Sequence, residues 1–325
     1  MGEDKTEEPL VTVGILSYNS AKTILETLES VKAQTYKNLE LIISDDASKD
    51  DTVEVCRKWI EENKDRFVRC EILTVPENTG IPANANRRLA ASKGVWSKGV
   101  AADDLLLPDC VENFVNYVKE NPQAEIVFAK VKIYYDNFKE ENFKEVDDMG
   151  GKYFCEKYDT AQKQYHALLR RFYCHAPAMF AKTSILQKVK YDERIKNMED
   201  YPMWLRLTKS GAAFHFMDKE AVCYRRSNSI CKDIYDPRKK LIFFLTTVEL
   251  FKRLYVYDNL NFFRRLIKKY SYCRIKMFDK MGLLKEGDMS PFSKRLLVAL
   301  DFILSPQAIY YSVKNAYRRI LKKHK

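Results

Sequence analysis

The chain has 325 residues, 46% of them hydrophobic and 31% charged, which is typical of a globular protein and excludes a disordered one. This length suffices for one large domain or two ordinary ones. No two of the eight cysteines have C-x-x-C spacing, so the sequence signals no zinc or redox motif. The acidic, polar start MGEDKTEEP has no signal-peptide features, and we therefore expect a reducing cytosolic setting.

The net charge of +11 is unevenly distributed along the chain. Residues 238–325 contain 21 Lys and Arg against 6 Asp and Glu, whereas residues 1–237 contain 35 against 39. This asymmetry predicts a near-neutral domain at 8–237 followed by a basic helical region at 238–325. Nucleic acid is not an expected partner, because the basic excess lies outside the main domain.

Strand and helix patterns alternate through the first 120 residues. We expect strands at 11–19, 39–46, 70–78 and 94–102, and helices at 21–35, 50–62, 83–93 and 109–120. This alternation predicts a parallel sheet with right-handed crossovers, in which ligands bind outside the carboxyl ends of the strands. The polar clusters Ser17–Asn19, Asp45–Ser48 and Asp103–Asp104 all follow expected strands, so they should converge on one crevice.

The pattern is looser after residue 135. The polar stretch 140–154 predicts a mobile segment. Further elements are expected as helices at 160–172 and 199–211, a strand leading into a helix at 176–186, and a strand at 221–229. Beyond Pro237 the pattern is almost wholly helical.

Asp103 and Asp104 follow an apolar strand, although adjacent carboxylates repel each other and are costly to desolvate. No G-x-G-x-x-G follows the first strand, and the glycines of GVWSKG lack the Lys-Ser/Thr of a phosphate-binding loop. Carboxylates at strand ends suit a divalent cation that screens phosphate oxygens. Taken singly, such a pair is more often a helix cap or loop feature.

Five segments together carry a family resemblance. In chain order they are VGILSYN, LIISDDASKDDT, ENTGIPANANRRL, KGVWSKGVAADD and MEDYPMWLRL. Across residues 10–230 they resemble the family 2 glycosyltransferases, whose motifs include V-x-I-I-x-x-Y-N, D-D-G-S-x-D-x-T, G-I-P-x-x-x-N-R, D-x-D-D and E-D. The resemblance implies an α/β fold of the GT-A (Rossmann-like) type, a mixed sheet flanked by helices, here with a C-terminal helical extension.

The resemblance also implies a reaction. It predicts inverting, metal-dependent transfer of a hexosyl or N-acetylhexosaminyl group from a nucleotide sugar, a UDP-sugar by preference. The acceptor would be a saccharide or lipid-linked saccharide in bacterial surface-polysaccharide assembly. A non-catalytic nucleotide- or carbohydrate-binding protein that retains the fold is the alternative, motivated by Ala101, which replaces the first Asp of the D-x-D motif.

The donor-binding residues that the resemblance implies are Ser17, Asn19, Asp45, Asp46, Asn86, Arg87, Asp103 and Asp104. Ser17 and Asn19 would form the floor of the nucleobase pocket. Asp45 and Asp46 would accept the uracil imide N–H, although an Asx turn and a helix cap are the alternative. Asn86 and Arg87 would lie near the base and phosphates, whereas Arg88 is expected to be a helix-surface charge.

The same resemblance implies the catalytic groups. Asp103 would bind the metal, Mn²⁺ or Mg²⁺, and Asp104 would orient it or cap the next helix. Asp200 would take the proton from the acceptor hydroxyl, with Glu199 orienting a neighbouring group, unless the two acids merely start a helix.

Three further positions are less specific. Trp204, one turn beyond Asp200, would stack on an acceptor sugar or belong to the core. His175 and Arg225–Arg226 fall where relatives place acceptor- and diphosphate-contacting groups. A structural histidine is the commoner alternative.

The last 19 residues, 307–325, combine apolar and aromatic residues at helical spacing with several Lys and Arg. This pattern is typical of a helix that lies on an anionic membrane surface. The segment 296–304 is too short to span a bilayer. We therefore expect a cytoplasmic protein bound peripherally at the inner face of the cell membrane, with helices packed on the domain as the equally weighted alternative.

Overall fold

The computed structural model describes residues 8–226 and 247–256, and the isolated positions 270, 273, 277, 280, 281, 299 and 300. The chain divides into two compact units, Met1–Ser227 and Asn228–Lys325. The predicted boundary after residue 237 and the predicted tail helix 307–325 lie outside the described residues. Among the described residues, no helix has the length and apolar character needed to cross a membrane.

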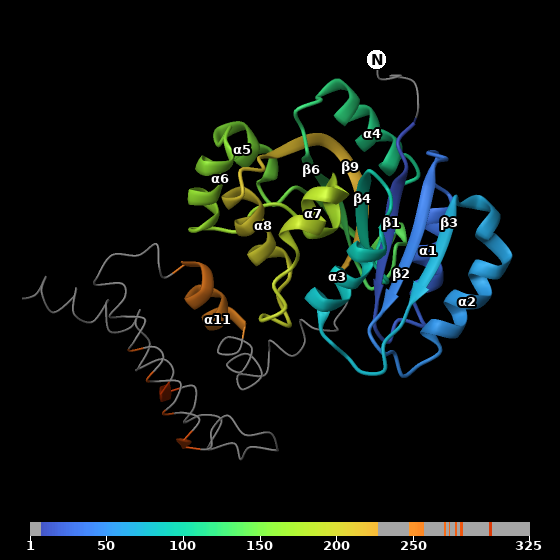
Figure 1. Cartoon of the computed structure of the whole chain (residues 1–325), viewed down its shortest axis with the longest axis horizontal. Coiled ribbons are helices and arrows are strands. Elements are labelled where there is room, and N and C mark those ends of the chain that lie inside the picture. Colours follow the sequence, from blue (N-terminus) through green and yellow to red (C-terminus); the bar gives the residue numbers. More distant parts are fainter. Residues whose placement is uncertain are drawn as a thin grey trace, which may run out of the picture. The chain divides into compact units, whose positions relative to one another are not determined.

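The described part of the first unit is built on one mixed sheet (Figure 1). Its strand order is β3-β2-β1-β4-β8-β6-β9-β5, and β7 pairs with β6. The strands are β1 (Val11–Ser17), β2 (Leu39–Asp45), β3 (Arg69–Leu73), β4 (Trp96–Ala101), β5 (Leu105–Leu106), β6 (Ile126–Tyr135), β7 (Phe143–Asp147), β8 (Phe180–Lys182) and β9 (Phe214–Arg226). Strands β1 to β4 are mutually parallel, as the alternating pattern predicted, whereas β5, β7 and β8 pair only in antiparallel fashion.

Helices connect most of the strands. They are α1 (Ile24–Lys32), α2 (Thr52–Asn63), α3 (Ile81–Ala91), α4 (Cys110–Glu120), α5 (Gly151–Lys157), α6 (Ala161–Leu168), α7 (Thr183–Val189) and α8 (Asp200–Lys209). Short helical turns lie at Lys64–Arg66 (η1), Glu140–Asn142 (η2) and Ala176–Ala178 (η3). In the second unit the structure describes α11 (Glu249–Phe251) and the π-helical η5 (Lys252–Val256).

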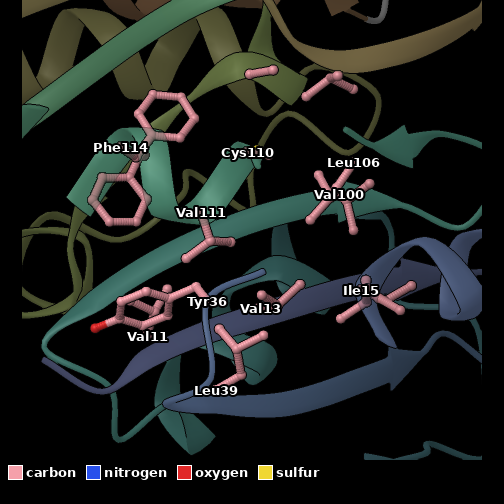
Figure 2. Packing of buried hydrophobic residues seen from close by; sticks show 14 of the residues in the cluster. Val11, Val13, Ile15, Tyr36, Leu39, Val100, Leu106, Cys110, Val111 and Phe114 are labelled. Atoms are coloured by element: carbon pink, nitrogen blue, oxygen red, sulfur yellow. The ribbon is translucent and has the colours of Figure 1, made fainter. Parts of the chain in front are cut away.

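The period-two pattern of β1 places its side chains on two faces. Val11, Val13 and Ile15 are fully buried in a core that includes residues of α1, α2 and α4 (Figure 2). Gly14, from the alternate set, faces α3 instead. Burying a Val or Ile side chain stabilises the fold by about 1.5–3 kcal/mol, so this alternation fixes which face receives each helix.

The expectation of a mobile segment at 140–154 is wrong. These residues form η2, β7 and the start of α5, and β7 pairs with the second half of β6. Phe154 of α5 is fully buried, and its ring stacks on Tyr173 at a centroid distance of 4.6 Å. A few aromatic side chains thus fix a stretch whose average composition is polar.

Strand β9 is longer than the 221–229 expected and contains irregularities. Phe216 pairs with Phe128 of β6, but Val222 pairs with Val131, so six steps of β9 accompany three steps of β6. Such bulges leave residues unpaired and bend the strand. Beyond the bulges, β9 continues in regular register to Arg226 beside Tyr135.

Candidate functional site

The polar clusters predicted at strand ends do lie along one edge of the sheet. Ser17 pairs with Asp45 at the ends of β1 and β2, and Leu16 pairs with Ala101 at the end of β4. The backbone N–H of Ala102 donates to the carbonyl of Leu16 at 3.0 Å. Parallel neighbours in register bring their carboxyl ends together, so the convergence predicted from the sequence is confirmed for these three strands.

Ser17, Asn19 and Asp45 form one hydrogen-bonded network through Ser48. The Asp45 carboxylate accepts the Ser17 hydroxyl at 3.0 Å, and the Ser48 backbone N–H and hydroxyl at 2.8 and 2.5 Å. The Ser48 hydroxyl in turn accepts the backbone N–H of Asn19 at 2.8 Å. Ala47, which lies between Asp46 and Ser48 just after the end of β2, has a φ of +67°, so the chain turns sharply here.

Asp46 joins this strand end to the start of α3. Its carboxylate accepts the Thr79 hydroxyl at 2.6 Å, the Gly80 N–H at 2.8 Å and the Arg87 guanidinium at 3.1 Å. Burial would raise the pKa of Asp46, but the bonds from Thr79, Gly80 and Arg87 lower it below its ordinary value. The side chain is therefore ionised at neutral pH.

Asp45 and Asp46 are only 1% and 3% exposed, and donors of the same chain surround both carboxylates. Their predicted contact with a uracil N–H stays a prediction that requires an exchange of partners. Tyr18, which the sequence reasoning passed over, is 48% exposed at this same strand end. Its position between Ser17 and Asn19, in the polar cluster that follows β1, could have marked it as a candidate site residue.

The neighbours Asn86 and Arg87 point to different places. Arg87 donates to Asp46 and, through Nη2, to Asn84 Oδ1 at 2.9 Å. The Asn86 carboxamide instead pairs with the backbone of Tyr191, with Nδ2 to the carbonyl at 3.0 Å and Oδ1 to the N–H at 2.8 Å. The structure therefore does not bring the Asn86 side chain into the Asp45–Asp46 network, because successive helical residues face about 100° apart.

The expectation that Arg88 is a surface charge is wrong. Its side chain is 2% exposed and donates to the Ser97 hydroxyl at 3.0 Å. Space for it exists because Gly14 on β1 has no side chain. Lys98 on β4 is a second buried cation, and no pattern in the sequence signalled it. Its ammonium donates to the carbonyls of Gly99, at 2.7 Å, and Pro177, and burial lowers its pKa to about 8.

Asp103 and Asp104 form an acidic turn directly after β4. Asp104 is 1% exposed, and its Oδ1 accepts the backbone N–H of Arg225 at 2.9 Å. Its buried Oδ2 has no hydrogen-bond partner. Burial and the charge of Asp103 raise the pKa of Asp104 well above its ordinary value. Burial also raises the pKa of Asp103, against the opposing effect of Arg225.

Arg225 fastens this acidic turn to β9. Its Nε donates to the carbonyl of Asp103 at 2.8 Å, its Nη1 to the carbonyl of Asp136 at 2.7 Å, and its Nη2 pairs with Glu26. The guanidinium carbon also lies 4.3 Å from the ring centroid of Phe138. Each guanidinium nitrogen is thus engaged by the protein, which argues against the expected diphosphate contact for Arg225. Arg226 is exposed.

Glu199 and Asp200 lie at the start of α8. Burial and the neighbouring Asp200 raise the pKa of Glu199 to about 7. Burial raises the pKa of Asp200, although its Oδ1 accepts the Tyr201 N–H at 2.6 Å. Trp204 is 1% exposed and packs edge-on against Phe128 at 5.1 Å, so it belongs to the core and cannot stack on an acceptor sugar.

His175 is buried, and its Nε2 lies 2.9 Å from Asp147 Oδ2. Burial lowers the pKa of His175 despite the opposing carboxylate. The imidazole is therefore neutral at pH 7 and tied to β7. Its predicted contact with an acceptor remains a prediction.

The acidic turn has the donor chemistry for a hard divalent cation. No group of three or more His, Cys, Asp or Glu side chains capable of holding a metal occurs among the described residues. Mg²⁺ commonly binds one or two carboxylates and completes its shell with water and substrate phosphates. Asp103, together with the unpartnered oxygen of Asp104, fits such a partial shell.

Together, the parallel half-sheet, its carboxyl-edge aspartates and the antiparallel second half define the GT-A class of glycosyltransferase fold. Solved glycosyltransferase structures share this fold. Staphylococcus aureus TarS 1–349 in complex with UDP-GlcNAc has a TM-score of 0.54 and 15% identity, and the match covers 92% of this chain and 74% of that one. The mannosyltransferase PcManGT from Pyrobaculum calidifontis in complex with GDP-Man and Mn²⁺ has a TM-score of 0.51 and 17% identity, with 97% and 77% covered.

Sequence comparison defines the family. The model of glycosyl transferase family 2 matches residues 12–189, more than half of the chain, and the protein belongs to that family. An uncharacterized glycosyltransferase of Methanocaldococcus jannaschii is 27% identical over 232 residues, which are 68% of this chain and 72% of that protein. Chondroitin synthase of Escherichia coli is also 27% identical, but the match over 67% of this chain spans only 29% of the synthase.

Proposed function

We propose that this glycosyltransferase is a metal-dependent, inverting enzyme that transfers a sugar from a UDP-sugar to a saccharide or lipid-linked saccharide in surface-polysaccharide assembly. The observation that carries the proposal is the shared sheet edge, where the Ser17–Asp45 network lies beside the acidic turn Asp103–Asp104. The UDP-GlcNAc complex of TarS and the relationship to chondroitin synthase support the choice of UDP and of a polysaccharide acceptor.

In this proposal the nucleotide binds over the ends of β1 and β2. The exposed Tyr18 ring supplies a flat apolar surface for the base. Asp45 and Asp46 hold the turns that shape the pocket, and Asp45 turns one lone pair to the base when Ser48 moves away. Arg87 is half-buried and paired with Asp46, and its Nε and Nη1 donate to Ser44 and Thr79, so its contact with the phosphates requires an exchange of partners.

Asp103 and Asp104 would hold Mn²⁺ or Mg²⁺, which would neutralise charge on the leaving diphosphate. Arg225 keeps the acidic turn in place by bonding the carbonyl of Asp103 and the carboxylate of Asp104. Ala101 removes one carboxylate of the D-x-D motif but leaves this arrangement intact. The proposed reaction therefore does not depend on the missing aspartate.

Asp200 is the proposed base for the acceptor. As the acceptor hydroxyl oxygen forms its bond to the anomeric carbon, its proton passes to the Asp200 carboxylate. The bond from that carbon to the diphosphate oxygen breaks on the opposite face, which inverts the configuration. The raised pKa of Asp200 strengthens it as a proton acceptor near neutral pH.

A donor panel tests this proposal. The full-length protein is incubated with UDP-GlcNAc, UDP-GalNAc, UDP-Glc, UDP-Gal and GDP-Man, with Mn²⁺ or with EDTA, and both Tm and nucleotide release are measured. We expect one UDP-sugar to raise Tm in the presence of Mn²⁺, because a ligand that binds only the native state stabilises it. Release of UDP should then require Mn²⁺.

Two results would redirect the proposal. Stabilisation by a UDP-sugar without release of UDP, across an acceptor panel of oligosaccharides, would favour the non-catalytic alternative. Stabilisation by GDP-Man alone would overturn the choice of nucleotide.

We further propose that the protein binds peripherally to the inner face of the cell membrane through its basic C-terminal region. The support is the excess of 21 basic over 6 acidic residues in 238–325. Cationic side chains beside an anionic surface each contribute about 1 kcal/mol at low salt.

A further inference from the structure

Helix α3 contacts both halves of the candidate site. Its N-cap residue Gly80 and its residue Arg87 donate to Asp46, at 2.8 and 3.1 Å, where β2 ends. Its residue Asn86 contacts the segment 190–199, which connects α7 to α8 and ends at the proposed acid pair. Helix α3 therefore contacts both Asp46, in the proposed donor site, and the segment 190–199, which leads to Asp200 at the start of α8.

The contact at Asn86 is a two-way amide pair. Its Nδ2 donates to the Tyr191 carbonyl at 3.0 Å, and its Oδ1 accepts the Tyr191 N–H at 2.8 Å. Nδ2 also donates to Glu193 Oε1 at 2.7 Å. A backbone N–H and C=O that leave water need partners, and here one side chain supplies both. Two opposed bonds fix the orientation of the Tyr191 backbone as well as its distance.

Other contacts show that the segment 190–199 packs closely against the start of α3. A Cβ at Gly80 would lie 3.2 Å from the Cβ and 3.3 Å from the carbonyl oxygen of Lys196. The Tyr191 side chain is 9% exposed. Burial raises its pKa to about 12, Arg88 opposes this rise, and Glu199 and Asp200 add to it. The Tyr191 phenol thus lies within electrostatic reach of both acids.

We propose that Asn86 is a positioning residue, whose carboxamide holds the Tyr191 backbone and thereby sets the place of Asp200 relative to the donor beside Arg87. This inference rests on the proposed function, because the position of Asp200 matters only if that carboxylate acts on the acceptor. It replaces the donor-binding role that the sequence resemblance assigned to Asn86. The two roles differ in consequence, since losing a donor contact weakens nucleotide binding, whereas losing a positioning contact frees the segment.

The experiment compares full-length Asn86→Ala and Asn86→Asp with a matched control, Asn113→Ala. Asn113 lies on α4, and its Oδ1 accepts Lys219 Nζ at 2.8 Å. Three quantities are measured: hydrogen exchange of the amides of 190–200, the affinity for UDP in Mn²⁺ by calorimetry, and turnover of UDP-GlcNAc with an oligosaccharide panel. Asn86→Asp keeps an acceptor for the Tyr191 N–H but has no donor for its carbonyl.

For Asn86→Ala we expect amide exchange in 190–200 to accelerate by about tenfold or more, because the pair no longer holds the segment closed. Turnover should fall by about 10- to 100-fold, since misplacing a reacting group by about 1 Å costs that much. UDP affinity should stay within about twofold of wild type, because no proposed nucleotide contact is removed. Asn86→Asp should show the same pattern at least as strongly, because its second carboxylate oxygen faces the Tyr191 carbonyl and Glu193, and Asn113→Ala should change none of the three.

Unchanged exchange of 190–200 in Asn86→Ala would overturn the inference. A fall in UDP affinity as large as the fall in turnover would also overturn it, and would restore Asn86 to the donor site. Exchange and UDP affinity do not depend on which sugar is transferred, so absence of turnover in wild type would count against the proposed function alone. If Asn86→Ala fails to fold, the better-matched Asn86→Asp provides the same comparison.

Discussion

The Arg88 side chain fills the space between β1 and α3 that a side chain at Gly14 would otherwise occupy. A Cβ at Gly14 would lie 2.2 Å from Cδ of Arg88 and 2.4 Å from its Nη1, well inside van der Waals contact. The Nε of Arg88 is buried without a hydrogen-bond partner. Burial lowers the pKa of this arginine, yet a guanidinium keeps its proton in proteins. Helix α3 therefore rests on β1 through a cation that only a glycine can accommodate.

Gly14→Ala should lower the free energy of unfolding by about 1–3 kcal/mol, because overpacking a filled interior displaces neighbours. In an Arg88→Ala background the same substitution should cost less than about 1 kcal/mol, since the added methyl group enters vacated space. Urea unfolding of the four proteins measures both values. Equal losses in the two backgrounds would contradict the shared volume.

Asp103→Asn should weaken Mn²⁺-dependent UDP binding by about tenfold or more, since an amide is a poorer ligand for a hard cation than a carboxylate. Calorimetry with UDP, with and without Mn²⁺, measures the loss. Asp109→Asn is the control, because Asp109 is exposed and makes no side-chain cap bond at the start of α4. Unchanged UDP affinity in Mn²⁺ would remove Asp103 from the metal site.

The rate of transfer should rise with pH through about 7. Burial and Asp200 raise the pKa of Glu199 to about 7, so Glu199 becomes ionised beside Asp200 as the pH rises through neutrality. Glu199→Gln removes one of the two charges and should move the acidic limb of kcat/KM to lower pH. Asp200→Asn should still bind donor but transfer little. If Glu199→Gln is inactive while Asp200→Asn transfers normally, the base is Glu199.

Lys98 should impose a pH dependence on stability. Burial lowers its folded-state pKa to about 8, whereas the unfolded value is about 10.5. Between these values the unfolded chain binds more protons, so this lysine makes stability rise with pH. The unfolding free energy of wild type, minus that of Lys98→Met, should therefore increase by about 1–3 kcal/mol from pH 8 to 10. A pH-independent difference would contradict the lowered pKa.

Removing residues 307–325 should weaken membrane binding without affecting the donor site. The full-length protein should sediment with anionic vesicles at low salt and release at high salt, since the attraction is screened. The truncated protein should not sediment, yet should bind UDP in Mn²⁺ as wild type does. Equal sedimentation of both forms would indicate that the tail packs as an ordinary helix.

The sequence predicted the parallel half of the sheet well because its information is local. Each strand and helix from Val11 to Glu120 has its own hydrophobic period, and consecutive crossovers bring the strand ends together. For this reason the sequence alone predicts Ser17, Asp45 and Asp103 at one edge of the sheet. Strand β6 has an equally apolar run, but no α-helix follows it directly. The sequence therefore did not indicate that β6 pairs with β7, β8 and β9.

Side-chain directions were not predictable because they depend on distant partners. Arg88 is buried because of Gly14, 74 positions earlier, and Asn86 turns toward Tyr191, 105 positions later. The family motif marked Asn86 and Arg87 as a pair, and helical geometry separates them. Trp204 packs with Phe128 and Phe214, whose strands meet only in the folded sheet.

The irregular stretch of β9 gives the chain spare length between two fixed ends. One end follows α8 with its acid pair, and the other places Arg225 on the acidic turn. Between them, the unpaired residues Asp218 and Lys219 are exposed, and Asp218 forms an ion pair with Lys130; Glu220, which is in register with Lys130, forms an ion pair with Lys132. A residue added or removed there can be absorbed by enlarging or shrinking the bulge. The same change between Val222 and Arg225 would substitute a neighbouring side chain for the guanidinium that holds the turn.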